Sequence, residues 1–146
     1  FIDSYFKRFP KIRDYMQEIK SNLEENGYVE TLFNRRIYIN DSNSKNHRLK
    51  GFAERQAINA PIQGSAADII KLAMVKIHKN LFNYKNDVSM LMQVHDELVF
   101  EIKENSIDRY SKIIQEIMEH ANLPKVSLNV NLKVDIGFGD NWAEAH

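Results

Sequence analysis

The chain has 146 residues, 43% of them hydrophobic, which suits one domain or one large subdomain with a modest core. It contains no cysteine, which excludes disulfide frameworks and thiolate metal sites, and no apolar run approaches the length of a membrane span. Its 20 basic and 20 acidic side chains balance, which argues slightly against a stand-alone nucleic-acid binder. We therefore expect a soluble intracellular protein whose first residues are not a signal peptide.

The first 26 residues are expected to be helical, because apolar side chains recur there at steps of three and four. The face that they share consists of Phe9, Ile12, Met16, Ile19 and Leu23. Pro10 suits the first turn of the main helix, and Gly27 suits its end. Two β-prone runs then flank Asn34 and Arg35, which predicts a hairpin over residues 28–40.

The next segment, NDSNSKNHRLKG, is polar and lacks periodicity, so we expect a mobile loop over residues 40–51. From position 35 to position 55, six basic residues face two acidic ones, a local excess of four positive charges. The basic ones are Arg35, Arg36, Lys45, Arg48, Lys50 and Arg55. This charge indicates either a solvated loop or a segment that a bound polyanion orders.

Residues 52–82 form the longest predicted helix. Its expected apolar side consists of Ile58, Ile62, Ala66, Ile69, Ala73 and Ile77. Pro61 and Gly64 interrupt the pattern, so we expect a kink, a local widening or two abutting helices. Such a defect can serve packing alone or mark a functional position.

The remaining elements complete an α+β pattern. VSMLMQV and LVFEI are predicted strands, apolar at nearly every position, so both faces of their sheet should be covered. A helix is expected over residues 105–122 with Asn105 as its N-cap, and a third strand over residues 127–136. The order of elements after Gly27 corresponds formally to a split βαβ, ferredoxin-like arrangement, which by itself indicates no function.

Two carboxylates, Asp96 and Glu97, follow His95 at the tight turn between the two apolar strands. An unpartnered carboxylate beside a buried sheet is costly, and a divalent cation is the simplest partner. Magnesium suits hard oxygen ligands and accepts few protein contacts. The alternative is a polar turn that only closes the hairpin.

The predicted long helix also carries a polar stripe at spacings of four residues: Arg55, Asn59 and Gln63. Arginine can contact a phosphate, and the two amides can bond base edges, including the minor-groove acceptors common to all base pairs. The alternative is a set of hydrogen bonds that ties an irregular helix to its neighbours. The stripe ends near Gly64, so we expect the first half of this helix to face an opening and the second half to be buried.

The segment QVHDELVFE resembles motif C of the family A DNA polymerases, and ERQAINAPIQGSAADIIK resembles the segment that precedes it in these enzymes. The similarity runs from YFKRFP to VDIGFGDNW. It implies that Asp96 binds catalytic metal ions, that Glu97 assists, and that His95 lies near the primer terminus. It also implies contacts with the primer–template duplex from three helix residues, namely Arg55, Asn59 and Gln63.

The resemblance implies an incomplete polymerase palm: an antiparallel motif C hairpin and a third strand packed against long helices. Residues 52–146 would belong to the palm, and residues 1–51 would form the helix and hairpin that precede it. The 146 residues contain neither the family's motif A aspartate nor its motif B helix, so we expect the chain to be inactive alone. We also expect it to self-associate through the strand edge where motif A would pair. His146 falls where the family's chains end, which indicates the natural C-terminus.

For the intact enzyme, the resemblance implies primer–template DNA and deoxynucleoside triphosphates as partners and two Mg²⁺ ions as cofactors. Its location would be the bacterial cytoplasm and nucleoid, or an organelle. The alternative function is a non-catalytic module derived from a palm, which binds DNA or protein.

Overall fold

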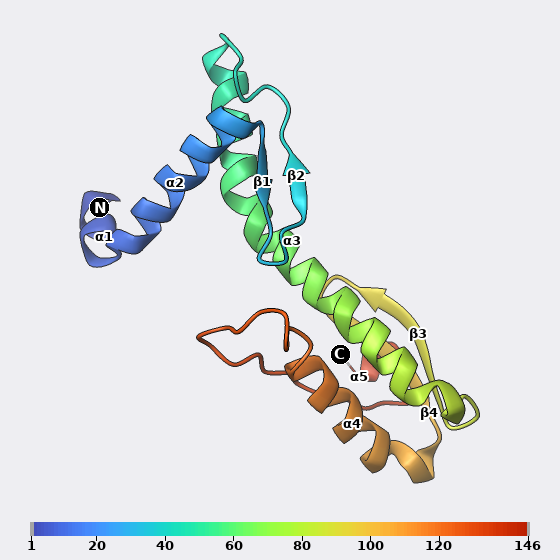
Figure 1. The fold of residues 1–146 in the computed structure, drawn as a ribbon. Coiled ribbons are helices and arrows are strands. Elements are labelled where there is room, and N and C mark those ends of the chain that lie inside the picture. Colours follow the sequence, from blue (N-terminus) through green and yellow to red (C-terminus); the bar gives the residue numbers. More distant parts are fainter. Residues whose placement is uncertain (1, 146) are drawn as a thin grey trace. The chain divides into compact units, whose positions relative to one another are not determined.

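The computed structural model describes residues 2–145 (Figure 1). They form two compact units, one up to Ser65 and one from Ala66 onward, and helix α3 contributes to both. The structure confirms the expected α+β class, because helices are combined with two small antiparallel strand pairs. No helix among these residues has the length and apolar character needed to cross a bilayer.

The first unit begins with two helices, α1 (Ile2–Arg8) and α2 (Pro10–Asn26). The predicted positions of Pro10 and Gly27 at the two ends of this helix are confirmed. Pro10 occupies the first turn of α2, where a backbone N–H would have no helical acceptor. Gly27 ends α2 with a left-handed backbone (φ 71°), and its N–H donates to the Leu23 carbonyl at 2.9 Å. Of the predicted apolar face only Leu23 is fully buried, while Phe9 and Ile12 are exposed.

The predicted hairpin is also confirmed, with β1 (Tyr28–Glu30) paired antiparallel to β2 (Arg36–Tyr38). Asn34 in its connection has a φ of 61°, a conformation that asparagine tolerates better than most residues. The core of this unit joins α2, the hairpin and α3. It consists of Leu23, Val29 and Ala57, with Ile19, Ile37, Ile39 and Ala60 packed against them.

Helix α3 (His47–Leu81) is longer than predicted. It begins five residues before Phe52. The Arg48 N–H donates a hydrogen bond to Asn46 Oδ1 at 3.0 Å, which caps the first turn. The Lys50 ammonium also lies 2.6 Å from the Glu24 carboxylate of α2. The expected loop is therefore shorter. Pro61 lies inside one unbroken α-helix, so the predictions of two abutting helices or a local widening are wrong.

The predicted apolar side of α3 is right for its second half and wrong for its first. Ala73 and Ile77 are buried, whereas Ile62 is 62% exposed. The buried face of the first half is made of small residues, namely Ala53, Ala57, Pro61 and Gly64. Small side chains let neighbouring backbone approach closely, which a search for large apolar residues does not detect.

The second unit contains β3 (Val88–Val94), β4 (Glu97–Ile102), α4 (Ile107–Glu119) and the short α5 (Trp142–Ala145). Single 3-10 turns, Phe82–Tyr84 and Glu104–Ser106, precede β3 and α4. Strands β3 and β4 pair antiparallel, with a bulge between Met90 and Met92. Leu91 is 57% exposed at this bulge, so the expectation that both faces of the sheet are covered is wrong for β3.

The core of the second unit lies where α3, the sheet and α4 meet. Its buried members are Ala73, Ile77, Leu81, Val88, Tyr110, Ile114 and Ala121. The predicted apolar face of α4 is confirmed, with Ile113, Ile117 and Met118 also packed against this core. The predicted N-cap is wrong, because Ser106 occupies that position and makes no side-chain capping bond.

The predicted third strand over residues 127–136 is wrong, because these residues have no strand partner. The segment is held by α4 side chains instead. Gln115 Nε2 donates to the Val134 carbonyl at 2.8 Å, and the Val134 N–H donates to Glu119 Oε1 at 3.1 Å. The palm-like sheet of the described residues is therefore the β3–β4 hairpin alone.

Candidate active site

The acidic turn is a two-residue connection made of His95 and Asp96. Val94 at the end of β3 pairs with Glu97 at the start of β4, which fixes the register. His95 has a φ of 51°, which is uncommon outside glycine and frequent at functional turns. Gln93 Nε2 donates to the His95 carbonyl at 2.7 Å, so the turn is held by its own strand. The predicted residues His95, Asp96 and Glu97 are thus brought together.

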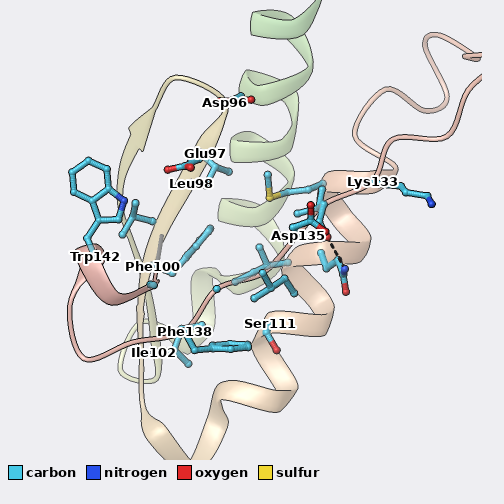
Figure 2. Close-up of a pocket in the computed structure, with 18 residues that line it drawn as sticks. Asp96, Glu97, Leu98, Phe100, Ile102, Ser111, Lys133, Asp135, Phe138 and Trp142 are labelled. Carbon is cyan, nitrogen blue, oxygen red and sulfur yellow. Dashed lines mark hydrogen bonds between the residues drawn. The ribbon is translucent and has the colours of Figure 1, made fainter.

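The two carboxylates differ in their surroundings: Asp96 is exposed, and Glu97 is partly buried. Both line a cavity of about 680 Å³ that β4, α4 and the C-terminal segment enclose. Figure 2 shows Asp96 and Glu97 at one end of this cavity, with Phe100 and Phe138 farther along. The cavity therefore has mostly apolar walls and a negatively charged end.

The acidic turn alone does not form a complete metal cage. Among residues 2–145, no group of three or more histidine, aspartate or glutamate side chains is placed to hold an ion. Two adjacent carboxylates are hard oxygen donors, which suit magnesium with waters and substrate oxygens completing its shell. The residues present therefore fit one part of a magnesium site.

The open end of the β3–β4 hairpin is closed by an ion pair between Lys103 and Asp87, with Nζ 2.8 Å from Oδ1. The hydrogen bond from Lys103 lowers the pKa of the Asp87 carboxyl. Its other oxygen lies 3.5 Å from the Tyr110 hydroxyl of α4. These contacts fix the end of the hairpin remote from the acidic turn.

The predicted polar stripe lies in the first unit, on α3. Arg55, Asn59 and Gln63 are all exposed, as predicted for a helix half that faces an opening. The opposite side of the same helix half is covered by α2 and the β1–β2 hairpin. Tyr15 of α2, for example, donates its hydroxyl to the Ile58 carbonyl at 2.8 Å. Burial raises the pKa of this tyrosine.

The basic cluster between positions 35 and 55 is partly engaged inside the chain. Arg36 pairs with Glu30 at 3.1 Å, and Lys50 pairs with Glu24. Arg35 reaches across to α3, where its Nη2 donates to the Gly64 carbonyl at 3.1 Å. Local pattern does not predict this last contact, because its partners are 29 residues apart.

The profile of DNA polymerase family A matches residues 1–144, which is nearly the whole chain. The chain belongs to DNA polymerase family A. Its family A relatives include DNA polymerase I of Rhizobium leguminosarum, 47% identical over all of this chain and 15% of that protein. DNA polymerase I of Streptococcus pneumoniae is 46% identical over 99% of this chain and 16% of that protein. The chain thus spans about one sixth of the length of these curated relatives.

A solved structure is similar over almost the whole chain. It is described as the POL domain of Pol1 from M. smegmatis in complex with DNA primer-template and dNTP. The TM-score is 0.89 at 38% identity, covering 99% of this chain and 25% of that one. The resemblance stated from the two long motifs is therefore confirmed, and so is a partial palm.

Proposed function

We propose that the chain supplies the motif C half of the active site of a DNA-directed DNA polymerase that acts in replication and repair. In the intact enzyme, the primer 3′-hydroxyl attacks the α-phosphate of a deoxynucleoside triphosphate. A new O3′–phosphorus bond forms, and pyrophosphate leaves. The main support for this proposal is the adjacent pair of Asp96 in the hairpin turn and Glu97 at the start of β4, in a chain that the family A profile matches over residues 1–144.

Asp96 and Glu97 would hold Mg²⁺ in this enzyme, with Asp96 as the principal ligand. The exposed Asp96 carboxylate at the end of the cavity supports this role. When bound, the two ions of such a site activate the attacking hydroxyl and stabilise charge on the leaving group. A motif A carboxylate would complete the site, and no such motif occurs in the 146 residues. We therefore expect the chain to be inactive and to bind magnesium weakly by itself.

The exposed stripe on α3 would contact the primer–template duplex. Arg55 would bond a phosphate, while Asn59 and Gln63 would reach minor-groove acceptors, which test base-pair geometry without reading sequence. His95 would lie near the primer terminus. The M. smegmatis structure, whose description names DNA primer-template and dNTP, supports these partners. The bacterial relatives support a location at the nucleoid in the cytoplasm, with an organelle as the alternative.

The isolated chain would self-associate through the β3–β4 sheet. The sheet has two strands, so each presents an edge without a strand partner among the described residues. Leu91 and Met92 on β3 are 57% and 41% exposed. An exposed apolar edge of this kind favours pairing with another chain. Sedimentation at rising concentration should show dimers or larger species, and a monomer throughout would contradict the proposal.

The catalytic assignment is tested with Asp96→Ala in the intact polymerase. Single-nucleotide incorporation should fall about 10³-fold or more, while the primer–template Kd stays within about threefold. Glu101→Ala removes an exposed carboxylate of β4 away from the acidic turn and should leave incorporation unchanged. Near-normal incorporation by Asp96→Ala would contradict the metal role. A parent protein that binds DNA and lacks incorporation would favour the non-catalytic module.

The DNA-contact assignment is tested separately with Arg55→Ala. Removing one phosphate contact should weaken primer–template binding and lower the slope of log K against log salt by about one. Fluorescence anisotropy at salt concentrations from roughly 50 to 200 mM measures both the affinity and this slope. An unchanged slope would exclude Arg55 as a phosphate contact.

A further inference from the structure

The β1–β2 hairpin approaches α3 closely at one residue, Gly64. A Cβ atom at this position would lie 2.7 Å from Thr31 Cγ2 and 2.8 Å from Ile37 Cδ1. Contacts this short force a shift, either of the Thr31 and Ile37 side chains or of the hairpin that carries them. The absence of a side chain at Gly64 therefore allows the hairpin to pack closely on α3.

Three polar contacts surround this approach. Arg35 Nη2 donates to the Gly64 carbonyl at 3.1 Å, and the Leu32 N–H donates to Ser65 Oγ at 2.9 Å. Ser65 Oγ in turn donates to the Pro61 carbonyl at 2.6 Å. Pro61 lacks an N–H, so the helical hydrogen bond to the Ala57 carbonyl is missing one turn before Gly64. The contacts of the hairpin with Gly64 and Ser65 therefore lie next to an interruption in the hydrogen bonding of α3.

The fastened turn is the one that carries Gln63. Gln63 is exposed, whereas the next two residues, Gly64 and Ser65, are buried beneath the hairpin. Asn59 precedes Gln63 by one helical turn on the same exposed side. The β1–β2 hairpin thus contacts one face of α3, and the side chains of Asn59 and Gln63 project from the opposite face.

We propose that Arg35 is a positioning residue for DNA binding: it holds the α3 turn that presents Gln63 and does not itself bind a phosphate. This inference rests on the proposed DNA contacts of the stripe. The competing role is a direct phosphate contact, because Arg35 as a whole remains exposed and belongs to the basic cluster. The two roles differ in salt dependence, since only a phosphate contact releases counterions.

The first test measures primer–template affinity of the intact polymerase as a function of salt. Arg35→Met should weaken binding about tenfold with an unchanged salt slope. Arg36→Met is the matched control, because it removes the same charge from the neighbouring residue, which pairs with Glu30 instead of α3. Its affinity should stay within about twofold of the parent. A slope lowered by about one in Arg35→Met, or an equal loss in Arg36→Met, would overturn the proposal.

A double-mutant cycle shows whether Arg35 acts through Gln63. Once Gln63→Ala is present, adding Arg35→Met should cause little further loss of affinity, because the positioned group is already gone. Additive losses would overturn the proposal. Unchanged affinity in Gln63→Ala together with an unchanged salt slope in Arg55→Ala would instead overturn the proposed function of the stripe.

A size-compensation experiment tests the same link without altering charge. Gly64→Ala should weaken DNA binding as Arg35→Met does, again with an unchanged salt slope. Adding Thr31→Ser and Ile37→Val removes the two methyl groups that the new Cβ would meet, so the triple variant should regain affinity. Melting curves establish that each variant is folded. A folded Gly64→Ala variant with parental affinity, or a folded triple variant without recovery, would overturn the proposal.

Discussion

Lys76 of α3 makes three hydrogen bonds through its ammonium group in the second unit. Its Nζ donates to three backbone carbonyls just beyond α4, at 3.1 Å from His120, 3.0 Å from Ala121 and 2.6 Å from Leu123. The last carbonyls of a helix and the residues after it lack intrahelical donors and carry partial negative charge. Lys76→Met keeps most of the apolar stem and removes the ammonium, so it isolates these bonds.

The expected cost follows from the exposure of the three bonds. The bond to Ala121 is partly buried and is worth about 1.5 kcal/mol, the lower end for a charged donor. The other two are exposed and add about 0.3 kcal/mol each. Lys76→Met should therefore lower the free energy of unfolding by about 2 kcal/mol, or Tm by about 6 °C for a chain of this size.

Thermal unfolding of the 146-residue chain, followed by circular dichroism at low micromolar concentration, measures this cost. The control is Lys71→Met, which removes an exposed ammonium from the same helix and should cost less than about 0.5 kcal/mol. A Lys76→Met variant that is no more destabilised than Lys71→Met would contradict this prediction, because the three bonds to the residues after α4 would then contribute nothing to stability.

Two further predictions concern stability. Lys103 lowers the pKa of Asp87, so the stabilisation from their pair is present above the ordinary carboxyl pKa and is lost as pH falls through the lowered value. Asp87→Asn should lower Tm near pH 7, and the difference should shrink as pH falls below the ordinary carboxyl pKa; a constant difference would contradict this. Gly27→Ala should cost about 1 kcal/mol because of its positive φ, whereas Gly51→Ala inside α3 should stabilise by about 0.5 kcal/mol. If denaturant titrations showed the same change in unfolding free energy for Gly27→Ala and Gly51→Ala, the role of Gly27 at the end of α2 would be contradicted.

The sequence predicted those helix ends and turns that depend on the backbone preferences of single residues. Pro10 and Gly27 marked the ends of α2, because a fixed φ and a left-handed φ are properties of single residues. Asn34 marked the turn of the first hairpin in the same way. The acidic turn at Asp96 was predicted because two strongly apolar strands leave only its residues to connect them.

Features that depend on distant partners could not be predicted from local pattern. Apolar and polar residues alternate from Leu128 to Val134, which indicates an extended segment, but a strand also needs a partner edge. Here the backbone N–H and carbonyl of Val134 form hydrogen bonds with side chains of α4 instead. The first turn of helix α3 has a local cap at Asn46, and it is also held by the ion pair of Lys50 with Glu24, 26 residues away in sequence. The contact of Arg35 with Gly64 likewise joins residues that are far apart in sequence.

The central claim is that Asp96 holds a catalytic metal ion, and a change of ligand softness tests it most directly. The chain has no cysteine, so Asp96→Cys places a single thiolate at the acidic turn among these 146 residues. A thiolate is a poor ligand for magnesium and a good one for softer ions such as Cd²⁺. We predict that Asp96→Cys in the intact polymerase loses nucleotide incorporation with Mg²⁺ and recovers part of it when Cd²⁺ is added, while incorporation by Glu101→Cys is unaffected. Full incorporation by Asp96→Cys with Mg²⁺ alone would contradict it.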